Sequence, residues 1–156
     1  MKIEIGQKAP LFTLTDTDKK AVNLAEQQGK NVVLLFFPLA FTSVCTAELC
    51  ATRDDIATYN NANAQVYGIS VDSLFTLGKF KEDQRLNFPL LSDFNKEVSA
   101  AYGSLYSEFA FGMKGVSKRS AFVIDKNGIV QYAEVLENAG EHPDFNAIKE
   151  VLARLN

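Results

Sequence analysis

Apolar residues gather in short, unbroken runs along the chain, and the segments between the runs repeat apolar positions at helical spacing. The runs over residues 31–37 (NVVLLFF) and 65–71 (QVYGISV) show no alternation with polar residues. Such runs are typical of strands buried on both faces. FPLL at 88–91 is a third, shorter run, and its Pro89 favours the start of a strand or an edge strand. These patterns predict two buried strands and a third, short strand.

The intervening segments predict helices. Residues 42–61 form one long segment in which apolar side chains recur on a single face. The next helix is expected to begin at Ser73, a candidate N-cap. A short helix is predicted over 95–103, and the last helix over 143–155, with Pro143 in its first turn.

Two hairpins complete the pattern. Lys126 and Asn127 separate the apolar segments 119–125 and 128–135, and the dipeptide Asn127-Gly128 is a strong hairpin signal. Near the N-terminus, residues 11–14 are expected to pair with 21–24 across the polar turn TDTDKK.

The predicted order of elements favours an α/β protein. Early strand–helix–strand units favour parallel pairing, and the final hairpin adds an antiparallel pair. We therefore expect a mixed central β-sheet flanked by helices on both faces, which is a thioredoxin-like arrangement. No repeat or linker divides the sequence, so a single domain is predicted over residues 1–156. Sites in such sheets lie beyond the carboxyl ends of the strands.

Composition narrows the function classes. The chain of 156 residues is 47% hydrophobic and carries a net charge of −3, with no cluster of Lys or Arg. This charge does not indicate binding to nucleic acid or to a membrane surface. No apolar run approaches the roughly 18 residues that suggest a membrane span, and the N-terminal sequence lacks the pattern of a secretory signal. The expected location is the cytoplasm, where a permanent disulfide would be rare.

One of the two cysteines lies where a buried strand is expected to turn into a helix. The segment PLAFTSVC ends at Cys45, and Thr42 stands three residues earlier, at capping-box spacing. In the first helical turn, free amide groups and the helix dipole favour a thiolate. Pro38 could shape the loop and shield the sulfur. The Thr42 hydroxyl could cap the helix, or it could turn toward the sulfur or a substrate oxygen.

A thiolate at this position needs a nearby cation. Glu48, three residues after Cys45, has the wrong charge for that purpose. Arg119 begins the apolar segment RSAFVID, where a permanent charge needs a partner, and it could pair with both Glu48 and the Cys45 sulfur. Each residue also has a simpler interpretation. Cys45 could be a small apolar core residue, Glu48 a surface charge, and Arg119 a solvated strand end or structural ion pair.

Cys50 is the second thiol, and helical geometry separates it from the first. Residues five apart on an α-helix lie roughly 8.6 Å apart at Cα, whereas a disulfide needs about 4.4–6.8 Å. A bond between Cys45 and Cys50 therefore requires the first turns of the helix to unwind, and Cys50 could equally be an unreactive helix residue. His142 is the only histidine, so the chain offers a poor set of zinc ligands, and it has no nucleotide-binding motif.

These residues resemble the peroxiredoxins. Pro38, Thr42 and Cys45 match the family pattern P-x-x-x-(T/S)-x-x-C, and Arg119 opens a segment that reads R-x-x-F-V-I-D-x-x-G, where the family carries its active-site arginine. Further similarity extends over nearly the whole chain, in APLFTL, NVVLLFFPLAFT, YGISVDS, FPLLSDF and AYG.

The resemblance implies a thiol peroxidase with a thioredoxin-like fold and no metal or organic cofactor. It implies that Cys45 is the peroxidatic cysteine, that Thr42 and Arg119 bind and polarise the peroxide, and that Pro38 shields the sulfur. Glu48 corresponds to the acidic partner of the arginine. The implied substrates are hydrogen peroxide and organic hydroperoxides, with peroxynitrite as a further candidate.

The branch within the family stays open. FFPLAFT and FPLLSDF resemble the AhpE-like branch, in which a one-cysteine mechanism is common. The C-x-x-x-x-C spacing is similar to the bacterioferritin comigratory protein (PrxQ) branch, in which Cys50 would resolve Cys45 and a thioredoxin-like or glutaredoxin-like reductant would recycle the enzyme. Both monomers and homodimers are compatible with the resemblance. Two other interpretations are a general thiol–disulfide oxidoreductase, which the absence of C-x-x-C disfavours, and a redox-inert thioredoxin-like binding module.

Overall fold

The structure is a computed structural model that describes residues 2–156. It contains one sheet of seven strands in the order β2-β1-β5-β4-β3-β6-β7. The strands are β1 (Thr13–Asp16), β2 (Ala21–Asn23), β3 (Asn31–Phe36), β4 (Ala64–Ser70), β5 (Leu90–Ser92), β6 (Ser120–Ile124) and β7 (Val130–Val135). The helices are α1 (Ser43–Asp54), α2 (Ile56–Asn61), α3 (Leu74–Gln84), α4 (Glu97–Ala101) and α5 (Phe145–Arg154), with short 3₁₀ turns at Leu24–Gln27 and Ala110–Gly112.

The sheet is mixed, as the sequence predicts. Strand β3 pairs in parallel with β4, and β4 pairs in parallel with β5, which is the pairing expected of strand–helix–strand units. The other neighbours are antiparallel, including β3 with β6 and the predicted hairpin of β6 and β7. The N-terminal hairpin also forms, although its first strand is β1 rather than 11–14.

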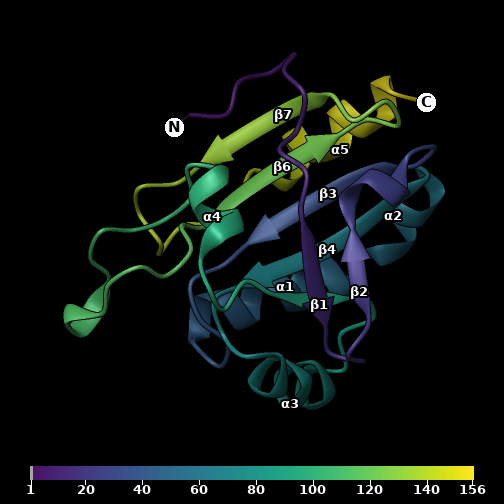
Figure 1. Cartoon of the computed structure of the whole chain (residues 1–156). Coiled ribbons are helices and arrows are strands. Elements are labelled where there is room, and N and C mark those ends of the chain that lie inside the picture. The colour runs from purple at the N-terminus through teal and green to yellow at the C-terminus, as the bar shows by residue number, and fades with distance from the viewer. Residues whose placement is uncertain (1) are drawn as a thin grey trace.

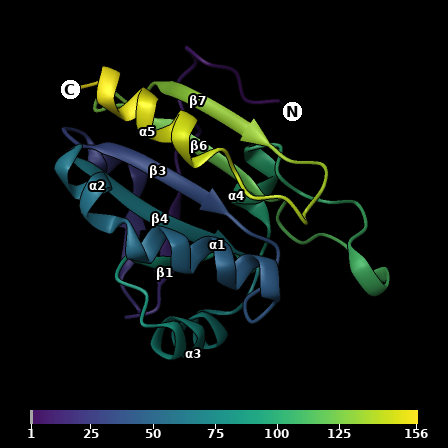
Figure 2. The same cartoon turned by 180° about the vertical axis from the view of Figure 1, so that it is seen from behind.

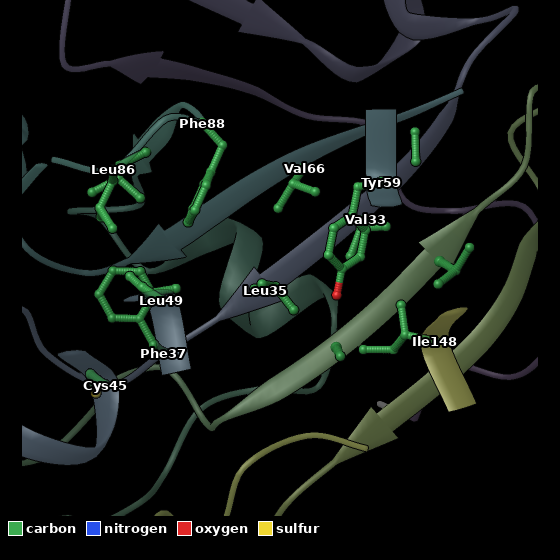
Figure 3. Close-up of a cluster of buried hydrophobic side chains, with 14 of the residues drawn as sticks. Val33, Leu35, Phe37, Cys45, Leu49, Tyr59, Val66, Leu86, Phe88 and Ile148 are labelled. Carbon is green, nitrogen blue, oxygen red and sulfur yellow. The ribbon is translucent and has the colours of Figure 1, made fainter. Parts of the chain in front are cut away.

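Helices cover both faces of the sheet. Val33 and Leu35 of β3 point into a core that α1, α2, α3 and α5 also line (Figures 2 and 3). Val32 and Leu34 belong to a second core, which Val98 of α4 also lines. Helix α4 lies on the opposite face of the sheet from α1 and α5 (Figures 1 and 2). Every residue of β3 is buried, which explains its unbroken apolar run. None of the helices within residues 2–156 has the length and apolarity needed to cross a membrane.

The prediction of one long helix over 42–61 is wrong in one respect, because the helix is interrupted at Asp55, which separates α1 from α2. Asp55 has φ −116° and ψ 17°, which are not helical values. Its carboxylate accepts a hydrogen bond from the Thr58 hydroxyl and pairs with Lys149 of α5. Aspartate side chains compete with helical hydrogen bonds in this way.

The structure corrects the predicted position of one proline, Pro143, and decides between the two positions predicted for another, Pro89. Pro143 precedes Asp144, whose side chain caps α5, so the proline lies outside the first helical turn. Asp144 is the better cap because its carboxylate accepts the Ala147 amide. Pro89 immediately precedes β5, which lies between β1 and β4, so the strand-start interpretation applies and the edge-strand one does not.

Candidate active site

The segment after β3 turns sharply to place α1 over the end of the sheet. Pro38 follows the strand and is buried. Phe41 has φ 68°, in the left-handed region, which costs a non-glycine residue about 1–3 kcal/mol. The Phe41 ring packs against Phe80 of α3, with ring centroids 5.1 Å apart. Strain of this kind persists only where surrounding contacts hold it, and it is common at functional sites.

Cys45 lies in the first turn of α1 and is completely buried. The first α-helical hydrogen bond joins the Thr46 amide to the Thr42 carbonyl. The three preceding amides of α1, Cys45 included, therefore have no acceptor within the helix. Figure 3 shows Cys45 at one end of the core cluster that includes Phe37 and Leu49.

Glu48 shares the buried face of α1 with Cys45, because residues three apart on a helix lie on one side. Its side chain has no exposed surface. The interpretation of Glu48 as a surface charge is therefore wrong for this structure, and the carboxylate needs a partner inside the protein.

Arg119 reaches this site because β3 and β6 are antiparallel. Phe36, at the end of β3, lies opposite Ser120, at the start of β6. Arg119 directly precedes β6, so its side chain lies beside the point where the chain leaves β3 for α1. The register of two strands thus joins residues that are more than 70 positions apart in the sequence.

Arg119 makes three hydrogen bonds while only 2% of its side chain is exposed. Nη2 donates to Cys45 Sγ at 3.2 Å, and Nη1 donates to Glu48 Oε1 at 2.6 Å. Nε donates to the carbonyl of Ala139 at 2.8 Å, which fixes the plane of the guanidinium. Of its five N–H groups, one on Nη1 and one on Nη2 have no acceptor among residues 2–156, and Nη2 lies next to the sulfur.

Burial dominates the electrostatics of Glu48. It raises the pKa of the carboxyl to about 7, although the Arg119 guanidinium opposes this shift through its charge and its hydrogen bond. The negative charge of Glu134 on β7 adds to the increase. The same carboxyl has one oxygen on Arg119 and a second, buried oxygen without a hydrogen-bond partner among the described residues.

Thr42 occupies the N-cap position of α1, but its side chain does not cap the helix. Its hydroxyl donates to the Leu39 carbonyl at 2.8 Å. Of the two roles considered for this hydroxyl, the structure excludes the cap. Because the hydroxyl proton is used within the loop, the oxygen is left as an acceptor for a hydrogen-bond donor in the site.

Cys50 lies apart from this group. It is half-buried on α1, and both cysteines are free thiols. Cys50 Sγ contacts Gln84 Oε1, at the end of α3, at 3.5 Å. The helix between Cys45 and Cys50 is continuous, so their sulfurs cannot bond in this conformation.

Asp72 is a site residue that the sequence patterns do not single out. Its Oδ2 accepts a hydrogen bond from the Ala40 amide at 2.8 Å and another from the Ser70 hydroxyl at 2.6 Å. It therefore ties the strained loop after β3 to the end of the neighbouring parallel strand β4. A signal was available, because carboxyl ends of adjacent parallel strands meet at one edge of the sheet, where Asp72 follows β4.

The resemblance described above implies that peroxide oxidises Cys45. On that expectation, Asp72→Ala should lower the rate constant of this oxidation about tenfold to a hundredfold, since small displacements of a reacting group are costly. Loss of the acceptor for Ala40 should also destabilise the protein by about 1–3 kcal/mol. The measurement is rapid-mixing kinetics on reduced protein. Asp72→Asn is the matched control, because it keeps one acceptor oxygen and should react faster than Asp72→Ala. A wild-type rate in the alanine variant would limit Asp72 to a structural role.

The remaining polar candidates do not enter the site. His142 is exposed in the loop before α5. Within residues 2–156, no group of three His, Cys, Asp or Glu side chains is arranged to hold a metal ion.

Comparison with known proteins relates both the fold and the sequence to one group. Residues 5–133 match the AhpC/TSA family. Alkyl hydroperoxide reductase E of Mycobacterium tuberculosis is 38% identical over 156 residues, which cover 98% of each chain. The Coxiella burnetii protein bcp, described by its name as a peroxiredoxin, is 39% identical over 132 residues, covering 83% of this chain and 87% of its own.

The structural likeness is equally extensive. The crystal structure of peroxidoxin BcpB from Mycobacterium tuberculosis superposes with a TM-score of 0.86, at 29% identity and 99% coverage of both chains. This likeness confirms the predicted thioredoxin-like fold, with its mixed sheet and helices on both faces.

Proposed function

Because the chain belongs to the AhpC/TSA family and is a peroxiredoxin-type peroxidase, we propose that it reduces hydrogen peroxide and organic hydroperoxides through Cys45. Peroxynitrite is a further candidate substrate. The observation that carries the proposal is the 3.2 Å contact between Arg119 Nη2 and Cys45 Sγ inside a buried site. A guanidinium at this distance stabilises a thiolate, which is the nucleophilic form of cysteine.

In the proposed reaction, the thiolate attacks one peroxide oxygen. A sulfur–oxygen bond forms, the oxygen–oxygen bond breaks, and the second oxygen leaves as water or an alcohol once protonated. Sulfur loses two electrons and becomes a sulfenic acid. The second N–H on Arg119 Nη2 would donate to the leaving oxygen, and a donor already in place stabilises the developing charge without reorganisation.

The loop residues have supporting roles in this proposal. The Thr42 oxygen, left as an acceptor by its bond to Leu39, would receive the O–H of the peroxide. The free amides of the first α1 turn would donate to the peroxide oxygens. Buried Pro38 would restrict water near the sulfur, and Glu48 would orient Arg119 through their 2.6 Å hydrogen bond.

We further propose that Cys50 resolves the sulfenic acid. The first turns of α1 would unwind, the Cys50 thiolate would attack Cys45, and water would leave as the disulfide forms. A thioredoxin-like or glutaredoxin-like protein in the cytoplasm would then reduce the disulfide. The half-buried position of Cys50 and the weak hydrogen bond of its thiol to Gln84, at 3.5 Å, support its release from the helix.

One observation favours a second candidate, a one-cysteine peroxidase that an external thiol resolves. In the structure, α1 is intact from Ser43 to Asp54 and keeps the two cysteines apart. The choice between the candidates depends on whether this helix opens after oxidation.

The proposal extends to a homodimer as one assembly state. Leu11, Phe75 and Phe94 are large apolar side chains that are 63–71% exposed. Leu11 and Phe94 also line a common pocket beside β1 and β5. Apolar side chains gathered on a surface mark contact sites, and a second copy of the chain would cover them.

The proposal is tested by quenched-flow oxidation of reduced protein followed by mass spectrometry, on the wild type and on Cys50→Ser. The wild type should consume one peroxide and lose two hydrogens, which marks a disulfide. Cys50→Ser should be oxidised equally fast, because the residue lies outside the Cys45–Arg119–Glu48 group. It should then retain one added oxygen and slowly gain a second, as a persistent sulfenic acid overoxidises.

The outcomes separate the candidates. If the wild type also retains the added oxygen until an external thiol is supplied, Cys50 is not the resolving residue and the one-cysteine cycle holds. If neither protein reacts with peroxide, the peroxidase proposal fails for Cys45.

A further inference from the structure

The buried site contains three ionisable groups and only one certain positive charge. Arg119 contacts both Cys45 and Glu48, and all three side chains are at most 2% exposed. Glu48 Oε1 accepts from Arg119, but Oε2 is buried with no hydrogen-bond partner in residues 2–156. An ionised carboxylate with a bare, buried oxygen is costly, whereas a carboxylic acid carries a proton on one oxygen and no net charge.

The charges of Arg119, Cys45 and Glu48 indicate how many protons Cys45 and Glu48 hold together. With Arg119 positive, a thiolate and a carboxylate together leave one uncompensated negative charge inside the protein. A single proton shared between Cys45 and Glu48 makes the site neutral. If Cys45 is the thiolate that the peroxidase reaction needs, that proton belongs on Glu48.

We propose that Glu48 stores the proton released by Cys45, so that the reduced, reactive site consists of a thiolate, a guanidinium and a carboxylic acid. This inference rests on the proposed peroxidase function and adds a role to Glu48 beyond orienting Arg119. Glu48 acts through Arg119 and the proton balance, and is a positioning residue in that sense.

The groups that face Glu48 from the surrounding elements favour this arrangement. Arg119 approaches from the start of β6, and Cys45 lies on α1 itself. Glu134 on β7 contributes negative charge, and Tyr59 on α2 stays neutral, because burial raises its pKa to about 12. Only Arg119 opposes protonation, and it divides its charge between the carboxyl and the sulfur. The raised pKa of Glu48, about 7, agrees with a proton held near neutral pH.

Storage of the proton balances the oxidation step within the site. The thiolate, hydrogen peroxide and the Glu48 carboxylic acid become a sulfenic acid, water and the Glu48 carboxylate. Sulfur gives two electrons to the oxygen–oxygen bond, and the proton of Glu48 ends on a product oxygen. The negative charge moves from sulfur to the carboxylate, so the buried charge stays constant and Arg119 keeps a partner throughout.

The test is a peroxide-induced infrared difference spectrum of reduced protein, with mass spectrometry of the same sample. The wild type should lose a carboxylic-acid C=O band and gain a carboxylate band, about one per Cys45 oxidised. Protein labelled with ¹³C at glutamate side-chain carboxyls should show the lost band at lower frequency, which assigns it to glutamate without a mutation.

Two matched variants complete the assignment. Glu48→Gln keeps an oxygen for Arg119, so Cys45 should still be oxidised, but the carboxylic-acid band should be absent. Cys45→Ser keeps Glu48 and should show no peroxide-induced change. If wild-type Cys45 is oxidised and no carboxylic-acid band is lost, or if Glu48→Gln loses the same band, proton storage is wrong while the peroxidase proposal stands. If wild-type Cys45 does not react with peroxide, both fail.

Discussion

Cys45→Ser is expected to reduce peroxidase turnover to the uncatalysed background. A serine hydroxyl does not ionise near neutral pH and does not give a stable oxidised form that a thiol could reduce, so both halves of the proposed cycle are lost. The fold should survive, because the smaller hydroxyl still offers Arg119 Nη2 an acceptor in place of the sulfur. Peroxide consumption in the presence of a dithiol measures the loss.

The control for this variant is Cys50→Ser, which removes the other thiol of the chain. It should keep fast oxidation by the first equivalent of peroxide, whereas Cys45→Ser should show none. Turnover that persists in Cys45→Ser would move the nucleophile elsewhere in the chain and would contradict the assignment of the whole site.

Arg119→Ala is expected to have the second largest effect, because it changes both reactivity and stability. Loss of a preorganised donor at a developing charge costs about 10²- to 10³-fold in rate. Removal of the guanidinium costs about 3–5 kcal/mol of unfolding free energy, because the Cys45 thiolate loses its countercharge and Glu48 Oε1 loses its donor. Stopped-flow oxidation and denaturant unfolding measure the two losses separately, and slower alkylation at neutral pH would report a smaller thiolate fraction.

A double variant separates these two effects. Arg119→Ala combined with Glu48→Gln removes the free-energy cost of keeping a buried carboxyl protonated near neutral pH, so part of the stability should return. The rate should not return, because no cation remains beside Cys45. A double variant that regains the rate along with the stability would show that Arg119 acts only by holding the fold together.

The strands could be predicted because their cause is local. In β3 and β4, every position or nearly every position is buried, and burial on both faces requires the continuous apolar runs found in the sequence. The β6–β7 hairpin is also marked locally, by Asn127-Gly128. The break between α1 and α2 could not be predicted in this way, because Asp55 is fixed partly by Lys149 of α5, almost a hundred positions later.

Some features of the candidate site follow from the local sequence, and others depend on which strands are neighbours. The position of Cys45 at a helix start follows from the nearby pattern of Thr42 and the preceding apolar strand. The burial of Glu48 does not follow from the nearby sequence, because an acidic residue on a helix gives no sign of which way it faces. Only the antiparallel register of β3 and β6 brings Arg119 to it. The Asp72 contact with Ala40 likewise depends on the neighbouring position of two strands.

The break at Asp55 also allows α1 to unwind without α2. Tyr59 anchors α2 in the core, and Asp55 is joined to α5 through Lys149, so α2 stays docked when the preceding segment frays. Unwinding of α1 that begins at Ser43 is therefore expected to end at Asp55, before α2. Local openings require less free energy than global unfolding, so we expect the segment from Ser43 to Asp54 to open while α2 and the sheet stay in place. Such a protein can alternate between a form with α1 folded over the site and a form with α1 unwound, while the sheet and the other helices stay folded.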